Sequence, residues 1–181
     1  EQVFGYALTI DPLTYSGIAL QKSERNGVHN GQILPCPYLT PIPGQVYQRL
    51  IENTEDGRTY TDIRTPIVNG ELPAVYLKRR TSVDRFSNDN FRVDLTSAEE
   101  QFSAEERKLI IRFAAAMNLE FGGMDILRDR SDGRIYIVDV NKTDMGPPTV
   151  LARQDKLTAM NALAEAFRRF IEHRLEAGKA A

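Results

Sequence analysis

The chain has 181 residues, of which 41% are hydrophobic and 27% are charged. This composition is that of an ordinary globular domain and excludes an intrinsically disordered chain. A net charge of −2 argues against a broadly basic nucleic-acid-binding protein. A single cysteine, Cys36, excludes an intrachain disulfide framework and a cysteine-rich zinc site. The lone cysteine also suits a reducing cytosol, and the longest apolar stretch is far too short to span a bilayer. We therefore expect a cytoplasmic protein with neither nucleic acid nor membrane as a partner.

The first half of the chain consists of short β-rich runs separated by turn residues. We predict strands over Val3–Ile10, Ile18–Ser23, Gln45–Ile51, Thr59–Val68 and Leu72–Arg80. The prolines at positions 35, 37, 41 and 43 predict an irregular loop between the second and third of these strands. Asn69-Gly70 is the pair of residues that two-residue hairpins prefer, so we expect the last two strands to pair.

Helical patterns enter in the second half. Ser103 and Glu106 form a capping box, which predicts that a helix begins there. Apolar residues that repeat every three or four positions from Met160 onwards predict a terminal helix. Between these helices we predict strands over Phe121–Arg128 and Arg134–Val140. The whole pattern indicates an α+β fold, with mixed or antiparallel sheets and helices packed on one face.

The most informative polar residues lie on these last two strands. Asp139 and Asn141 are two residues apart, so their side chains project from the same side of a strand that reads as buried. If Ser131–Gly133 forms a three-residue turn, Asp125 lies directly opposite Asp139. Two facing carboxylates repel unless a cation lies between them, and carboxylate and amide oxygens are ligands that suit Mg²⁺.

A purely structural explanation of Asp125 stays open beside the metal site. In that alternative, the carboxylate caps a turn or forms an ion pair with Arg128 or Arg134. The two explanations differ in what they require of Asp139, because only the metal site needs both carboxylates on the same face.

The segment Gly122–Leu127, followed by Ile137–Asn141, resembles the metal-binding end of the ATP-grasp enzymes. The glutathione synthetase-like and ribosomal-protein glutamate ligase-like branches are the most similar. The resemblance implies two β-rich lobes that close on ATP, with Asp125, Asp139 and Asn141 holding Mg²⁺ against the phosphates. Family members more often carry a glutamate at the position of Asp139.

The resemblance extends upstream to residues that contact the nucleotide. Gln45–Ile51 resembles the strand that binds adenine, which implies that the backbone around Arg49 and Ile51 contacts the base and that Gln48 lies near its exocyclic amine. Family members usually have an acidic residue at or next to the Gln48 position. Lys22 corresponds to the phosphate-binding lysine and Glu55 to a ribose-binding acid. Taken alone, Lys22 and Glu55 read as solvated surface residues.

Further cations match the family's phosphoryl-transfer residues. Asp62-Ile63-Arg64 resembles an acidic-X-Arg strand whose arginine reaches the transferred phosphate. Lys78 and Arg80 lie on one face of their predicted strand, where they can neutralise developing negative charge. The alternative for these two is a charged cluster that protects a sheet edge. The segment that supplies a further asparagine ligand offers two candidates, Asn88 and Asn90.

The resemblance implies a ligase that uses ATP and Mg²⁺ to activate a small-molecule or peptide carboxylate as an acyl phosphate, which an amine or thiol then attacks. An ATP-grasp kinase acting on a hydroxyl, and a nucleotide-binding module without turnover, remain alternatives. We expect a first lobe over residues 1–45 and a second over 46–181, together forming an ATP-grasp domain that lacks its N-terminal part. Both a monomer and a homodimer stay open.

Overall fold

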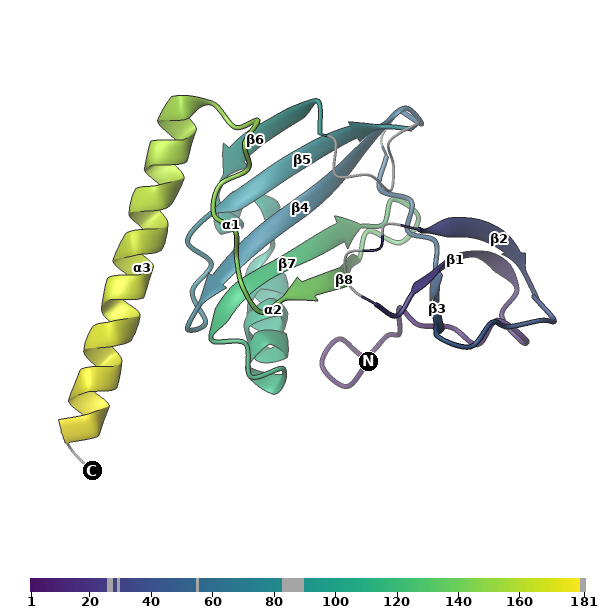
Figure 1. The fold of residues 1–181 in the computed structure, drawn as a ribbon, viewed down its shortest axis with the longest axis horizontal. Coiled ribbons are helices and arrows are strands. Elements are labelled where there is room, and N and C mark those ends of the chain that lie inside the picture. Colours follow the sequence, from purple (N-terminus) through teal and green to yellow (C-terminus); the bar gives the residue numbers. More distant parts are fainter. Residues whose placement is uncertain (26–27, 29, 55, 83–89, 180–181) are drawn as a thin grey trace.

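A computed structural model describes residues 1–25, 28, 30–54, 56–82 and 90–179 of the chain. Two antiparallel sheets lie side by side, and the chain passes from one to the other between β3 and β4 (Figure 1). The three-stranded sheet has the order β2-β1-β3, with bounds Gln32–Cys36, Gly17–Ser23 and Gln45–Arg49. The five-stranded sheet has the order β6-β5-β4-β7-β8, with bounds Arg92–Thr96, Val75–Thr81, Thr59–Val68, Phe121–Arg128 and Ile135–Asn141.

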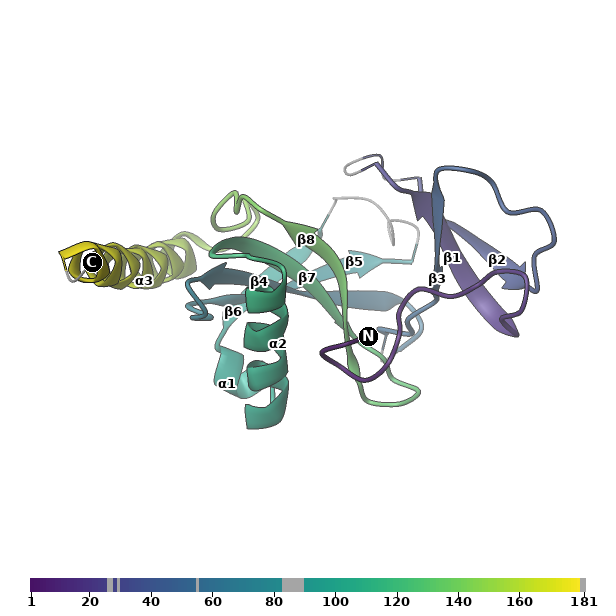
Figure 2. The same ribbon diagram turned by 90° about the horizontal axis from the view of Figure 1, so that it is seen from below.

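Helices cover both faces of the five-stranded sheet. The short α1 (Ala98–Gln101) and α2 (Ala104–Ala116) pack on one face, where Ile67, Ile110 and Met124 are among the fully buried core residues (Figure 2). The long α3 (Arg153–Lys179) packs on the opposite face through a second cluster that includes Tyr76 and Ala159. The expectation that the helices share one face is therefore wrong for α3.

Most of the predicted strands and helices are confirmed, but the irregular loop predicted from Pro35 onwards is wrong at its start, because Pro35 lies within β2 and pairs with Ile18. The capping box at Ser103 begins α2, and Asn69-Gly70 forms the β4–β5 hairpin turn with both residues at positive φ. The predicted strand over Val3–Ile10 is wrong, because this segment forms only an isolated bridge at Thr9. Its apolar residues instead anchor a loop, and Phe4 packs against the main core.

The β7–β8 register confirms one expectation through an unexpected route. Asp125 lies opposite Asp139 as predicted, but Ile126 pairs with Ile137, so Val138 is an extra residue in β8. The turn is one residue longer than assumed, because Asp129 rather than Arg130 pairs with Arg134 and closes the hairpin. The β-bulge at Val138 compensates for the longer turn and restores the predicted pairing of Asp125 with Asp139.

The division into lobes at residues 45 and 46 stays a prediction. β3 pairs with β1, so the change from one sheet to the other falls between Arg49 and Thr59. Within the ranges that the structure describes, none of the helices combines the length and the apolar character needed to cross a bilayer.

The substitution Glu106→Gln tests how α2 is fastened to the hairpin. Arg128 binds both carboxylate oxygens of Glu106, at 2.7 and 3.0 Å. Burial raises the pKa of Glu106, but the bonds from Arg128 and from the helix cap outweigh burial, so the pKa is lowered overall. Glutamine keeps the cap but loses the ion pair, so the free energy of unfolding should fall by about 1 kcal/mol at pH 7. Urea titrations at pH 7 and pH 3 measure the difference.

A carboxyl pKa that is lowered in the folded state stabilises the protein fully above the pKa of the unfolded chain, and this stabilisation is lost as the pH falls to the folded-state pKa. The advantage of Glu106 over glutamine should therefore disappear as the pH falls through the folded-state value. Glu105→Gln is the matched control, because Glu105 lies in the same turn and its ion pair among the described residues is with exposed Lys108. A loss that is equal at pH 7 and pH 3 would contradict the role assigned to the ion pair.

Candidate functional site

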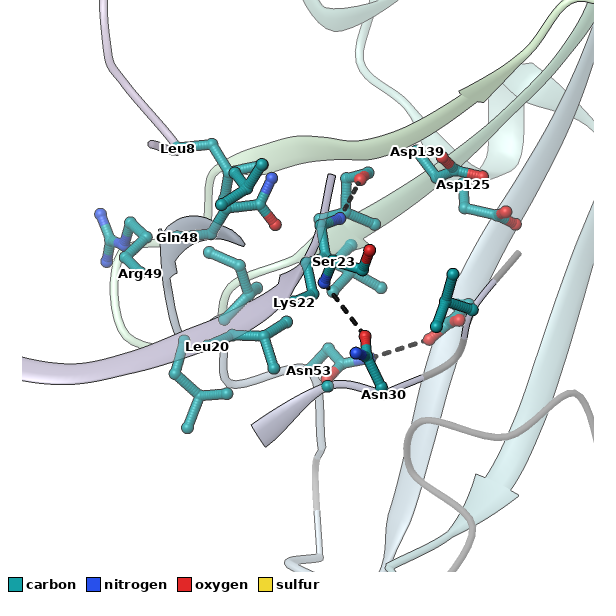
Figure 3. A pocket seen from close by; sticks show the side chains of 18 of the residues that line it. Leu8, Leu20, Lys22, Ser23, Asn30, Gln48, Arg49, Asn53, Asp125 and Asp139 are labelled. Atoms are coloured by element: carbon teal, nitrogen blue, oxygen red, sulfur yellow. Dashed lines mark hydrogen bonds between the residues drawn. The ribbon is translucent and has the colours of Figure 1, made fainter. Parts of the chain in front are cut away.

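A cavity of about 380 Å³ opens between the two sheets (Figure 3). This volume lies within the range of small-molecule pockets. Strands of both sheets contribute to its wall. The predicted site residues that line it are Lys22, Gln48, Arg49, Ile51, Lys78, Arg80, Asp125 and Asp139.

The bulge in β8 determines which side of the sheet Asp139 takes. Ile135 and Ile137 belong to the core on the helix side, and simple alternation would point residue 139 the same way. The extra residue reverses the alternation, so Val138 and Asp139 both line the cavity while Val140 returns to the core. Figure 3 shows the side chains of Asp139 and Asp125 close together at one end of the cavity.

Asp125 is balanced by two cations from neighbouring strands. Arg64 on β4 lies 3.3 Å from one carboxylate oxygen, and Lys78 on β5 lies 3.4 Å from the other. The structural alternative named Arg128 or Arg134 as the partner, and both are wrong, since Arg128 binds Glu106 and neither forms a described ion pair with Asp125. Both observed contacts are long for charge-assisted hydrogen bonds. Asp125 is thus held loosely by two positive groups.

Arg64 is held more tightly on its other side, by Asp144. The Arg64 Nη2 donates to a carboxylate oxygen of Asp144 at 2.8 Å, and the Asp144 side chain is only 3% exposed. Burial lowers the pKa of Arg64, but the carboxylates of Asp125 and Asp144 outweigh burial and raise it, so the guanidinium remains charged. Asp144 lies in the loop after β8 and was not predicted as a site residue, because nothing local marks a partner 80 positions away.

Gly123 makes room for this arginine. A Cβ at Gly123 would lie 2.4 Å from Arg64 Nη2 and 2.7 Å from the Asp144 carboxylate. The guanidinium therefore occupies the space in which any other residue would place its side chain. A glycine on β7, directly opposite β4, is a steric condition for the position of Arg64.

Lys22 reaches from the smaller sheet to the larger one. Its Nζ donates to the backbone carbonyl of Val138, the bulge residue, at 3.0 Å. Burial lowers the pKa of Lys22, and the carboxylates of Asp139 and Asp125 partly oppose this shift. The ammonium group therefore lies beside the two acidic residues, in the middle of the cavity (Figure 3).

Arg80 and Asp62 form a buried ion pair on the cavity wall. Both residues are less than a tenth exposed, and Asp62 also accepts a hydrogen bond from the Asn53 side chain at 3.1 Å. Arg79 points to the other side of β5 and pairs with Asp94, as alternation along a strand requires. Arg80 is thus paired inside the structure and lies on the same face as Lys78.

The other end of the cavity is formed by β3 and the segment before β1. The N–H of Arg49 donates to the carbonyl of Leu8, so the Arg49 carbonyl points to the same outer edge of β3. Gln48 is buried beside it. In Figure 3 Gln48 and Arg49 lie at the end away from Asp125, with the Arg49 side chain directed out of the cavity.

The remaining predicted residues divide into three groups. Asn141 follows Asp139 on the same face and donates its amide N–H to the Asp139 carboxylate at 2.8 Å. Asn90 is half-buried just before β6 and is not among the described residues that line the cavity. Glu55 and Asn88 lie outside the described residues, so their predicted roles stay predictions.

The donors at the acidic end of the cavity fit a hard divalent cation. Asp125 and Asp139 supply carboxylate oxygens from opposed positions, and Asn141 is an amide two residues from Asp139. Among the described residues no group of three His, Cys, Asp or Glu side chains gathers as a metal site, so the third ligand in such a site would be the amide. The long contacts of Asp125 with Arg64 and Lys78 can be exchanged for a cation at low cost.

Comparison with known proteins identifies the fold. The model of the RimK-like ATP-grasp domain matches residues 36–165. The structure of ATP-grasp ligase PsnB complexed with minimal precursor superposes with a TM-score of 0.57 at 15% identity, covering 88% of this chain and 55% of that one. PsnB complexed with minimal precursor, Mg and ADP gives 0.58 at 17%, covering 90% and 54%.

The chain thus spans about half the length of the solved structures it matches. At these identities the likeness shows the fold, and it agrees with the two antiparallel sheets described above. No curated protein sequence matches the chain significantly.

Asp144→Asn tests the anchoring of Arg64. Removing a buried charge leaves the guanidinium with only the loose contact to Asp125, so the free energy of unfolding should fall by about 3 kcal/mol. Asp94→Asn is the matched control: Asp94 likewise binds arginine, here Arg79 and Arg92, but is about one-third exposed, and its loss should cost about 1 kcal/mol or less. Chemical denaturation measures both, and equal losses would contradict the special position of Asp144.

Proposed function

Since the chain belongs to the RimK-like ATP-grasp family, we propose that it forms the ATP- and Mg²⁺-binding part of a ligase that activates a substrate carboxylate as an acyl phosphate. An amine or thiol then attacks the acyl carbon and releases phosphate. Members of this family are enzymes that use ATP and Mg²⁺. We propose the substrate carboxylate, the nucleophile and the role of each residue on the same footing.

The observation that carries the proposal is the order of chemical groups along the cavity. A buried edge of β3 with Gln48 lies at one end, the ammonium group of Lys22 lies in the middle, and Asp125 opposes Asp139 at the other end (Figure 3). An adenine base, a chain of phosphates and a divalent cation follow one another in the same order in MgATP. Backbone groups of β3 and Gln48 would bind the base, and Glu55 would bind the ribose.

The phosphates would lie among four cations that converge on one face. Lys22 would bind the phosphate chain, and Arg64, Lys78 and Arg80 would stabilise the charge on the transferred group. Mg²⁺ held by Asp125, Asp139 and Asn141 would neutralise phosphate charge and orient the oxygens. Such catalysis depends on positioning and electrostatics, so it requires no histidine or cysteine nucleophile.

A peptide is the substrate that the comparisons favour. PsnB was solved with a minimal precursor and, in another structure, with precursor peptide PsnA2 and AMPPNP. That second structure matches this chain with a TM-score of 0.54 at 16% identity.

Incubation with ATP, Mg²⁺ and carboxylate-bearing peptides, followed by trapping with hydroxylamine, tests the reaction class. A hydroxamate indicates an acyl phosphate, whereas a stable phosphate ester on a hydroxyl would overturn the ligase assignment in favour of a kinase.

Nucleotide binding itself is tested by thermal stability in the presence of AMPPNP and Mg²⁺. At a nucleotide concentration 100 times Kd, binding should stabilise the folded chain by about 2.7 kcal/mol. Asp139→Asn should abolish the part of this stabilisation that depends on Mg²⁺, because it removes one of the two carboxylates. EDTA added to the parent protein should have the same effect.

Asp155→Asn serves as the control, since Asp155 lies in the first turn of α3 and is not among the described residues that line the cavity. The proposal predicts that this variant keeps the full stabilisation. A parent protein that is folded yet shows no stabilisation by millimolar AMPPNP and Mg²⁺ would refute the proposed function.

Gly123→Ala tests the assignment of Arg64 to the transferred phosphate. The added methyl group displaces the guanidinium, so the affinity for AMPPNP should fall at least about tenfold relative to the affinity for ADP, which lacks that phosphate. Isothermal titration with each nucleotide measures the ratio. Gly178→Ala is the control, because an added Cβ there meets nothing within 4 Å. Equal losses for both nucleotides would place Arg64 elsewhere along the phosphates.

A further inference from the structure

A fully buried carboxylate outside the cavity ties the two sheets together. Asp129, in the turn between β7 and β8, is 1% exposed and accepts a hydrogen bond from Arg49 Nη2 of β3 at 3.0 Å. Its other oxygen accepts from the backbone N–H and the hydroxyl of Ser131, at 2.9 and 2.8 Å. A buried carboxylate is costly unless it is fully bonded, and Arg49 supplies the opposing charge here.

The second arm of the same guanidinium binds the hairpin again. Arg49 Nη1 donates to the Tyr136 hydroxyl at 2.7 Å, and that hydroxyl donates to Asp132 at 2.8 Å. The guanidinium carbon also lies 4.9 Å from the centre of the Tyr136 ring. Beside it, the N–H of Arg130 donates to the carbonyl of Glu52, just after β3, at 2.8 Å. The end of β3 is thereby fixed to the turn of the β7–β8 hairpin at several points.

The same hairpin carries Asp125 and Asp139 at its other end. Lys22 of the smaller sheet binds this hairpin as well, through Val138. One hairpin of the larger sheet therefore contacts both the strand assigned to adenine and the lysine assigned to phosphate. As long as the bonds of Arg49 to the hairpin hold, β3 stays at a fixed distance from the acidic pair.

We propose that the side chain of Arg49 is a positioning residue that sets β3 at a fixed distance from the acidic pair and so determines how the cavity discriminates a nucleotide from a bare phosphate chain. The inference rests on the proposed function. It assigns a role to a side chain that points away from the cavity, whereas the expected contact with the base involves only the Arg49 backbone. Arginine suits this role because its planar fork satisfies two partners at once, which a lysine ammonium at the same place cannot do.

The test compares two probes that share the phosphate chain, AMPPNP and inorganic tripolyphosphate, each with Mg²⁺ and measured by isothermal titration. The double variant Arg49→Met/Asp129→Asn removes the bond without leaving a buried charge unpaired. We expect its affinity for AMPPNP to fall about tenfold and its affinity for tripolyphosphate to change less than about twofold. Arg49→Lys should restore part of the AMPPNP affinity, because it keeps the charge but loses one arm.

Two further variants keep the test decisive if the double variant does not fold. Tyr136→Phe removes only the hydroxyl that one arm of Arg49 binds, and should weaken AMPPNP about threefold with tripolyphosphate unchanged. Arg134→Met is the matched control: it removes a cation from the same hairpin that stacks on Tyr6 rather than binding β3, and should leave both affinities unchanged.

The outcomes separate this inference from the proposed function. A folded parent protein that binds neither probe refutes the proposed function and the inference with it. A parent that binds AMPPNP more tightly than tripolyphosphate supports the proposed function. Variants that then keep the parental ratio of the two affinities, or lose both affinities equally, overturn the positioning role of Arg49 alone.

Discussion

The pairing of Asp125 with Asp139 across β7 and β8 is the constraint on which the rest of the cavity depends. Two carboxylates face each other only because a single extra residue, Val138, interrupts the alternation of β8. Without this bulge Asp139 would point into the apolar core beneath α2, where an unpaired charge is prohibitively costly. The bulge also exposes the backbone carbonyl that receives Lys22. The bulge thus places the carboxylate of Asp139 and the ammonium group of Lys22 on the same side of the larger sheet.

The charges around this pair suit the proposed entry of a cation, because Arg64 would keep a carboxylate partner. Arg64 has two carboxylate partners, and the tighter one, Asp144, contributes nothing to the cavity wall. If Asp125 turns to a metal ion, Arg64 keeps a buried partner and stays in the space that Gly123 provides. Lys78 would then be free to pair with the phosphates of the proposed nucleotide. The arrangement therefore conserves charge pairing in both situations, which a single Arg–Asp pair could not do.

Helix starts and turns that depend on neighbouring residues could be predicted, whereas ion pairs between residues far apart in the sequence could not. The capping box at Ser103 and the Asn69-Gly70 turn follow from spacing over a few positions. The opposition of Asp125 and Asp139 was predicted from a three-residue turn, and it holds because the longer turn and the bulge at Val138 cancel each other. The predicted strand at the N-terminus failed because its apolar residues serve as anchors for a loop. Asp144 and Asp129 escaped notice because each binds an arginine 80 positions away, and no local pattern encodes such a pairing.

The long-range contacts share one element, and this has a mechanical consequence. The β7–β8 hairpin receives Lys22 at its bulge, Arg49 at its turn and Arg64 through Asp125. Residues of both sheets bind β7 and β8. A displacement of the smaller sheet would therefore reach the acidic pair through hydrogen bonds rather than through a flexible connection. A ligand held by β3 at one end and by Asp125 and Asp139 at the other would meet a cavity whose length is set by that hairpin. The hairpin, more than either sheet alone, therefore defines the site.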